Sequence, residues 1–176
     1  MLEAIRTRRS VRSYSSKPIP PAVLERMHQA LRWAPSACNF QPWRFIFVTD
    51  GELRRQVAQA AFDQLWLAEA PIIVVGCGLA EQAYKSMGGY GNSAELDVAI
   101  ALDHLALAAV AEGLGTCWIG AFDERKIKHL LGIPAKAKPV AMMPLGYPSS
   151  ADLISPLEDA DRKPASEVFS TDRYPA

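Results

Sequence analysis

The chain has 176 residues, of which 49% are hydrophobic and 22% are charged. This length fits one domain, whose folding should bury roughly 70% of the surface that the unfolded chain exposes, and the composition is that of an ordinary globular protein. Nineteen basic residues offset nineteen acidic ones, which argues against nucleic acid or an anionic membrane surface as a partner, so we expect small-molecule partners.

The N-terminal segment has basic residues but no apolar run of signal-peptide length, and no segment offers about 18 consecutive apolar residues. We therefore expect a cytoplasmic protein without a membrane partner. The three cysteines are far apart, without C-x-x-C spacing or a histidine at metal-ligand spacing. The sequence thus predicts neither a disulfide framework nor a metal site, and the apolar neighbours of Cys77 and Cys117 favour buried thiols.

The first part of the chain alternates helical and extended patterns. A helix is expected from residue 2 to about residue 9, and a second follows the prolines of residues 18–21, since proline is tolerated in a first helical turn. Apolar residues of the second helix recur at helical spacing: Val23, Leu24, Met27, Ala30, Leu31 and Ala34. Residues 35–39 break this pattern, and the aromatic and β-branched run at 43–49 predicts a strand.

The middle of the chain is expected to hold a helix from residue 52 to about residue 66, a buried strand at 71–75 and a glycine-rich loop at 88–92. Residues 94–112 are nearly apolar all round, so this helix is expected to run through the middle of an assembly. Its few polar residues are the predicted surface positions: Glu95, Asp97, Asp103, His104 and Glu112.

The last part of the chain begins where Gly113 and Gly115 are expected to end that helix. The elements that follow are an apolar stretch at 116–119, a helix at 123–131 and a strand at 140–145. The tail from about residue 150 to 176 is rich in Pro, Asp and Ser and has no core of its own, so we expect it to wrap a partner subunit. The whole pattern predicts one domain over residues 1–176, of α+β class, with helices on both faces of one sheet.

A strand that runs into Gly76-Cys77-Gly78 invites comparison with a dinucleotide-binding fold, which places an acidic residue about twenty positions further on, where Asp97 stands. The third glycine of that motif is missing, and residues 79–92 show no clean amphipathic helix to receive a pyrophosphate. We therefore favour a buried strand that ends in a tight turn.

Two polar segments could bind a ligand. Arg8-Arg9-Ser10-Val11-Arg12 places three guanidinium groups and a hydroxyl at the end of the first helix, and Arg suits phosphate because its planar fork donates two parallel hydrogen bonds. The segment APSACNFQPW, residues 34–43, presents the amides of Asn39 and Gln41, which suit a planar heterocycle. The structural alternatives are a basic helix end that complements the helix dipole and a rigid connector.

A third segment, GLGTCWIGAFD, is rich in glycine. Gly120 and Ala121 allow close backbone approach just before a helix that Asp123 would cap. Free N–H groups there could donate to the edge of a ligand, and a glycine needed only for packing is the alternative.

Taken in order, the segments RRSVR, APSACNFQPW, GLGTCWIGAFDE, PLGYP and RKPASEVF resemble the nitroreductase family of flavoproteins from end to end of the chain. The resemblance implies a mixed sheet flanked by helices in an intertwined homodimer, with one FMN in each of two clefts between the subunits. The implied activity is that of an NAD(P)H oxidoreductase, in which hydride passes by way of flavin N5 to a nitroaromatic, quinone or similar acceptor in a ping-pong cycle.

The resemblance also implies roles for single residues. Arg8 and Ser10 would contact the phosphate and ribityl end of FMN, and Arg9 would contribute mainly through its backbone or as a further anion contact. Two catalytic contributions are implied: Arg12 would stabilise the negative charge at N1 and O2 of the reduced flavin, and the N–H of Gly120 would fix the geometry at N5.

Three further groups complete the implied flavin site. The segment that the partner subunit lays against the flavin ring would consist of Pro35, Ser36, Ala37 and Asn39, supported by Gln41. The segment under the ring would be Ile119, Gly120 and Ala121. The late phosphate contacts would be Arg162 and Lys163.

Other functions fit the same resemblance. One is different FMN chemistry on this fold, such as reductive dehalogenation or breakdown of the flavin itself, and NAD(P)H turnover with retained FMN would argue against breakdown. Another is a non-catalytic flavin-binding or sensor protein, which slow reoxidation by every acceptor would favour. No side chain in the sequence is an evident general acid or base.

Overall fold

Four strands form one sheet in the computed structural model, which describes residues 2–89 and 91–175. Their spatial order is β1 (Trp43–Val48), β2 (Ile72–Gly78), β4 (Lys138–Gly146) and β3 (Gly115–Thr116). Neighbouring strands pair antiparallel, and parallel pairing enters through an isolated bridge between Ser10 and Thr116. The N-terminal segment therefore joins the sheet at its β3 edge.

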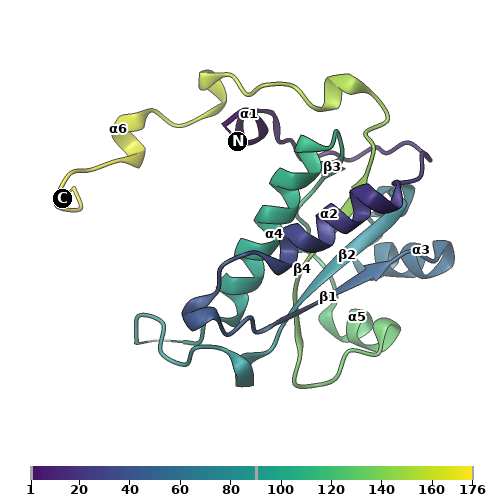
Figure 1. Cartoon of the computed structure of the whole chain (residues 1–176), viewed down its shortest axis with the longest axis horizontal. Helices are drawn as coiled ribbons and strands as arrows, with labels where there is room; N and C mark the ends of the chain where they lie inside the picture. Colours follow the sequence, from purple (N-terminus) through teal and green to yellow (C-terminus); the bar gives the residue numbers. More distant parts are fainter. Residues whose placement is uncertain (1, 90, 176) are drawn as a thin grey trace.

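The described residues form six α-helices: α1 (Leu2–Thr7), α2 (Pro21–Arg32), α3 (Gly51–Ala60), α4 (Ala94–Ala111), α5 (Glu124–Leu131) and, in the tail away from the sheet (Figure 1), α6 (Ala165–Val168). Asp50 and Asp123 begin α3 and α5, because their carboxylates accept the N–H groups of Leu53 and Lys126 at 2.8 and 3.1 Å. The predicted cap at Asp123 is thus confirmed.

Two cores lie on opposite faces of the sheet, as the alternation of side chains along β2 requires. Ile72 and Val74 pack with α2 and α4, whereas Ile73 and Val75 pack with α3 and α5. Figure 1 shows α2 and α4 side by side across the sheet and α3 and α5 apart from them. The predicted α+β fold with helices on both faces of one sheet is confirmed.

The strand predicted at 71–75 is longer than expected, because Gly76, Cys77 and Gly78 continue it in register with β1 instead of forming a tight turn. A β-carbon on Gly76 would lie 2.8 Å from Cγ1 of Val98 and 3.0 Å from Cδ1 of Leu102. Glycine is needed here because α4 packs directly on the strand.

The single helix predicted from residue 52 to about residue 66 is wrong. Helix α3 ends at Ala60, because Phe62 and Asp63 adopt left-handed backbone with φ of 56° and 59°, and a left-handed residue cannot continue a right-handed helix. A 3-10 helix at Leu65–Glu69 follows and buries Leu67 completely. Packing of that short helix on the second core overrides the helical pattern of the sequence.

Helix α4 is not covered on every side within one chain. A stripe of residues at helical spacing stays exposed or half-buried: Leu96, Ala99, Ile100, Asp103, Leu107 and Val110. We call these residues the α4 stripe. The predicted surface position of Asp97 is wrong, because its side chain is 2% exposed. Gly115, expected to help end the helix, instead begins β3, and Gly113 alone ends α4 with a φ of 73°.

The tail leaves the sheet after β4 and extends away from it past α1 (Figure 1). Residues 158–175 are exposed throughout, in agreement with a segment that has no core of its own. Within the described part of the chain, no helix combines the length and apolar character needed to cross a membrane.

Candidate functional site

The RRSVR segment is extended chain beyond α1 and not the end of a helix, because α1 stops at Thr7. It lies against β3, where the N–H of Val11 donates to the carbonyl oxygen of Thr116 at 2.9 Å. A β-carbon on Gly115 would lie 2.6 Å from Cγ2 of Val11, so this glycine permits the contact. The structure therefore brings the first and third motifs of the sequence together.

Tyr14 fixes the turn that follows Arg12. Its hydroxyl donates to the carbonyl oxygen of Val11 at 2.6 Å, and its N–H donates to Oε2 of Glu69 at 3.1 Å. Burial raises the pKa of Tyr14 far above its ordinary value. The phenol consequently stays protonated and remains a hydrogen-bond donor, which holds the backbone on which Arg12 is placed.

Four arginines line a hollow of about 440 Å³ next to this segment, which we call the basic hollow. Its lining consists of Arg8, Arg9, Ser10, Arg12, Asp152, Leu153, Ser155, Leu157 and Arg162. The tail reaches the hollow because the N–H of Leu157 donates to the carbonyl oxygen of Arg6 at 3.0 Å. Residues 152–157 were not anticipated, since the tail offers no periodic pattern from which to place them.

Charge in the basic hollow is unbalanced. Among residues 2–89 and 91–175, none of the four arginines lies within ion-pair distance of a carboxylate. Nη1 of Arg9 donates instead to the carbonyl oxygens of Arg6 and Arg8 at 3.0 and 3.1 Å. Guanidinium groups gathered in this way repel one another unless an anion lies between them, and phosphate matches their hydrogen-bonding geometry.

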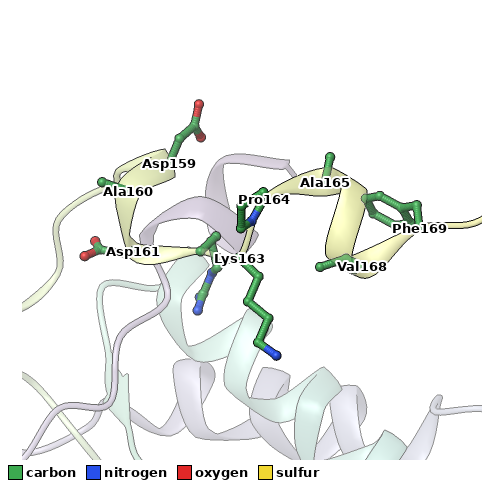
Figure 2. Close-up of a pocket in the computed structure, with 9 residues that line it drawn as sticks. Asp159, Ala160, Asp161, Lys163, Pro164, Ala165, Val168 and Phe169 are labelled. Carbon is green, nitrogen blue, oxygen red and sulfur yellow. The ribbon is translucent and has the colours of Figure 1, made fainter.

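Lys163, unlike Arg162, does not line the basic hollow. It belongs to a neighbouring hollow of about 940 Å³ that only tail residues line. Figure 2 shows Lys163 directed toward the helices, whereas Asp159 and Asp161 point away from them. Only the first of the two late contacts expected from the sequence therefore lies among the other arginines.

Gly120 has open space where a side chain would be. Among the described residues, chain neighbours aside, no atom lies within 4 Å of a β-carbon built on Gly120, and its φ is outside the left-handed region. Ile119 before it is anchored on β4, where it exchanges two hydrogen bonds with Met142 at 2.9 and 3.0 Å, and the carbonyl oxygen of Ala121 accepts from Nε2 of Gln64 at 3.2 Å. Packing within the subunit thus gives no reason for a glycine here, whereas close approach of a ligand would.

The APSACNFQPW segment forms a loop with strained backbone, which we call the amide loop (residues 35–41). Cys38, Asn39 and Gln41 have left-handed φ values of 51°, 55° and 51°, each of which costs on the order of 1–3 kcal/mol for a residue other than glycine. The hydroxyl of Ser36 accepts the N–H of Gln41 at 2.9 Å. Asn39 and Gln41 are exposed, and Nε2 of Gln41 donates to both oxygens of Asn39 at 3.1 and 3.2 Å.

The amide loop and the basic hollow lie at opposite ends of α4. The N–H of Ala37 donates to Oδ1 of Asp97 in the first turn of the helix at 3.0 Å, whereas the RRSVR segment lies beside β3, which follows the last turn. At 1.5 Å per residue, Asp97 and Ala111 are about 21 Å apart along the helix axis. Figure 1 shows this separation, so one chain does not bring the second motif to the other two.

No group of three or more His, Cys, Asp or Glu side chains among the described residues is arranged to hold a metal ion. The binding features of the chain are thus the basic hollow, the open backbone at Gly120 and the amide loop. This combination can bind a phosphate, donate backbone N–H groups and present amides to a planar polar ring.

Comparison with known proteins gives consistent matches. The model of the nitroreductase family matches residues 5–75 and 64–147. An NADH dehydrogenase of Thermus thermophilus is 31% identical in an alignment that covers 81% of this chain and 83% of that protein. A 5,6-dimethylbenzimidazole synthase of Rhodospirillum rubrum is 31% identical over 86% of this chain and 83% of its own. The solved structure of an NADPH:FMN oxidoreductase from Vibrio harveyi, complexed with NAD+, has a TM-score of 0.85 at 26% identity and covers 99% of this chain and 78% of that chain.

Proposed function

The chain belongs to the nitroreductase family, and from that premise we propose that it is an NAD(P)H-dependent oxidoreductase that binds one FMN per chain. When bound, FMN would supply the hydride-transfer chemistry, through its N5, between NAD(P)H and a nitroaromatic, quinone or similar acceptor in a ping-pong cycle. The observation that carries the proposal is the basic hollow, in which four arginines from both ends of the chain outnumber the one carboxylate of the lining, that of Asp152.

The residues of the hollow fit the phosphate end of FMN. Arg8, Ser10 and Arg162 would bind the phosphate through charge-assisted hydrogen bonds, and Arg9, whose guanidinium already binds backbone carbonyls, would add positive charge. Arg12 would lie beside N1 and O2 of the ring and favour the negative charge that they acquire on reduction.

The segment that follows β3 fits the ring. Gly120 has open space at the position of a β-carbon, and its N–H would donate to N5 and hold the ring in position for the nicotinamide. Ile119 and Ala121 would support the ring from below. Backbone hydrogen bonds to β4 fix Ile119, and a hydrogen bond from the side chain of Gln64 fixes the carbonyl group of Ala121. Lys163 would contact the phosphate only if the tail changes its path.

The second half of each site would come from a partner subunit. The amide loop and the basic hollow lie at opposite ends of α4, so Pro35, Ser36, Ala37, Asn39 and Gln41 would serve the flavin of the other chain in a homodimer. Two features support this assembly: the α4 stripe, which apart from Asp103 is apolar and is exposed or half-buried in one chain, and the exposed tail, which would wrap the partner.

The first test is the cofactor content of the purified protein. We expect a yellow protein that releases FMN, and not FAD, on denaturation, with about one equivalent per chain. Anaerobic stopped-flow with NADH or NADPH, followed by a panel of acceptors, then measures both half-reactions. A colourless protein that also fails to bind added FMN would remove the proposal.

Breakdown of the flavin is the second candidate, because one relative is named a 5,6-dimethylbenzimidazole synthase. The same stopped-flow samples decide between the two activities. If the FMN absorbance returns fully after repeated cycles of NAD(P)H and oxygen, the protein is an oxidoreductase that retains its cofactor. Loss of the isoalloxazine absorbance in proportion to NAD(P)H consumed would favour breakdown.

Subunit mixing tests the shared site. Arg8→Glu removes the phosphate contact and Asn39→Trp blocks the amide loop, so each variant alone should be inactive. In a heterodimer of the two, one cleft collects both changes and the other neither. A 1:1 statistical mixture should recover about one quarter of wild-type activity, since half of the molecules are heterodimers with one intact site of two. No recovery after demonstrated exchange would contradict the shared site.

A further inference from the structure

Asp97 is a buried carboxylate in an apolar setting. Among the described residues it is the only buried side chain of an ordinarily charged type, with 2% of its surface exposed. Within that part of the chain no cation lies within ion-pair distance of it. A buried carboxylate without a cation is costly, because hydrogen bonds must replace the water that it loses. Stability alone would favour an uncharged residue here.

Both oxygens of Asp97 are used. Oδ1 accepts the N–H of Ala37 at 3.0 Å, and Oδ2 accepts the hydroxyl of Ser93 at 2.7 Å. The Ser93 hydroxyl in turn accepts the N–H of Tyr84 at 3.2 Å. Asp97 also lies in the first turn of α4, where the helix dipole favours negative charge. One carboxylate thus ties the amide loop to the helix and to the segment before it.

The bond to Ala37 falls where the amide loop is strained. Ala37 directly precedes Cys38 and Asn39, whose left-handed φ values are 51° and 55°. Such a backbone conformation persists only where the surroundings hold it. The bond from the Ala37 N–H is the hydrogen bond that anchors this part of the loop to α4, because the bonds of Ser36, Asn39 and Gln41 lie within the loop itself.

We infer that Asp97 is a positioning residue that holds the amide loop in the conformation that serves the flavin of the partner subunit. The inference rests on the proposed function, since it is there that the loop meets a flavin. Asp97 touches neither cofactor nor substrate in this arrangement. It acts through the backbone of Ala37, and its hydrogen bond to that N–H holds the amide loop against the first turn of α4.

The first experiment measures how the loop holds FMN. Asp97→Ala removes the acceptor for the Ala37 N–H, so FMN should leave the holoenzyme at least tenfold faster, and the visible circular dichroism of the bound flavin should change. Asp97→Asn keeps an oxygen for the Ala37 N–H and should release FMN within threefold of the wild-type rate. Glu95→Gln is the matched control, because Glu95 is an exposed acid of the same helical turn that pairs with Lys138.

A purely structural role would give a different pattern. Asp97→Ala would then lower the melting temperature while FMN release and the flavin spectrum of the folded protein stayed as in the wild type, and this result would overturn the inference. If Asp97→Ala fails to fold, Asp97→Asn and Ser93→Ala take its place. Ser93→Ala leaves the Ala37 bond intact, so faster FMN release from Ser93→Ala than from Asp97→Asn would also overturn it.

The second experiment locates the effect in the partner's cleft. Asp97→Ala is mixed with Arg8→Glu in place of Asn39→Trp. If Asp97 acts through the amide loop, the two changes collect in one cleft of the heterodimer. Activity should then rise above the mean of the two separate variants by about one quarter of the activity that Asp97→Ala lacks relative to the wild type. No rise, while the Asn39→Trp mixture recovers, refutes the inference alone. If neither mixture recovers, the shared site itself is refuted.

Discussion

The charge of Arg12 should affect the reduction potential of the flavin more directly than that of any other residue of the proposed site. A pair of charges near 4 Å is worth at most about 4 kcal/mol at an effective dielectric of 20. Arg12 is exposed, so screening by water should reduce this to roughly 1–2 kcal/mol, or about 20–45 mV for a two-electron couple. Arg12→Ala should therefore lower the FMN potential by that amount. Spectroelectrochemistry measures the reduction potential of the bound FMN. An unchanged or higher potential in an Arg12→Ala variant that still binds FMN would contradict the proposed role of Arg12.

Cys77 should be an inert thiol in the folded protein. It is 2% exposed, and burial raises its pKa to about 11, against a smaller opposite effect of the Lys128 charge. Because the folded pKa is raised, this thiol favours the native state below pH 9.0 and loses that contribution as the pH rises toward 11.

A chemical test follows from that burial. The variant Cys38→Ser, which lacks the exposed cysteine, should react with a thiol reagent at pH 8 no faster than it unfolds, because Cys77 and Cys117 are both buried. The same variant in denaturant should show both thiols at once. Rapid labelling of the native variant would contradict the buried assignment.

Single residues differed in how far the sequence could place them. Side-chain chemistry and family resemblance assign Arg8 to the phosphate end and Arg12 to the ring of one ligand, and the structure gathers both in one hollow with Arg162. Asp97 was placed on the surface because charge usually lies there. Its burial depends on an N–H of residue 37, sixty positions away, and no local pattern reports such a contact.

Two glycines serve different elements and allow a matched test of packing. A β-carbon on Gly76 would press on Val98 and Leu102 at 2.8 and 3.0 Å, whereas one on Gly120 would meet open space. Gly76→Ala should therefore separate β2 from α4 and lower the free energy of unfolding by about 1–3 kcal/mol. Gly120→Ala should leave stability unchanged and weaken FMN binding at least tenfold, or about 1.4 kcal/mol. Denaturant titration and FMN titration of both variants check this, and the reverse pattern would contradict it.

The ion pair between Arg26 and Glu112 joins α2 to the residue that ends α4 and should make their contact depend on pH. Two hydrogen bonds of 2.5 and 2.7 Å link the side chains, and the bond from Arg26 lowers the pKa of Glu112 below its ordinary 4.5. A lowered folded pKa contributes stability above the unfolded value and loses it as the pH falls through the folded value.

Melting temperatures measured against pH test that dependence. Arg26→Gln should melt below the wild type at pH 7, and the difference should close as the pH falls below 4.5. Arg55→Gln removes an exposed pair within α3 and is the control, with a smaller effect at every pH because it joins no two elements. A difference between Arg26→Gln and wild type that persists at pH 3 would contradict the role of Glu112.

Elements with a strong period were predictable, and those set by distant contacts were not. The amphipathic spacing of α2 and the aspartate before α5 indicated both helices to within a few residues. The break after Ala60 depends on left-handed backbone at Phe62 and Asp63. Phenylalanine has no marked preference for that conformation, so the sequence does not indicate the break. The extension of β2 through Gly78 depends on α4, which packs on it from a later part of the chain.

At the scale of the molecule, the sequence predicted the class of fold and the order of its motifs but not their distances. The amide loop and the basic hollow are expected to reach one flavin from different subunits, and α4 separates them within one chain. Sequence order carries no information on which subunit a contact comes from. The apolar helix, the coreless tail and the family resemblance together suggest the dimer. The separation gives that suggestion a geometric reason.

The last prediction concerns the α4 stripe as the surface on which two chains meet. Leu96 is 49% exposed, and with Ile100 and Leu107 it forms an apolar row that a lone subunit would leave in water. A carboxylate in the place of Leu96 would lose its water at that interface without gaining a partner, so Leu96→Glu should shift the protein toward monomer. Because the site is proposed to need both chains, the monomer should also lose FMN while its far-ultraviolet circular dichroism stays unchanged.

Ala135→Glu is the control, because it adds the same charge at an exposed position outside the α4 stripe, and this variant should remain dimeric and yellow. Sedimentation velocity with absorbance at the flavin band measures both properties at once. A Leu96→Glu monomer that keeps a full equivalent of FMN would refute the shared site, and a Leu96→Glu dimer indistinguishable from wild type would place the contact between subunits on another surface.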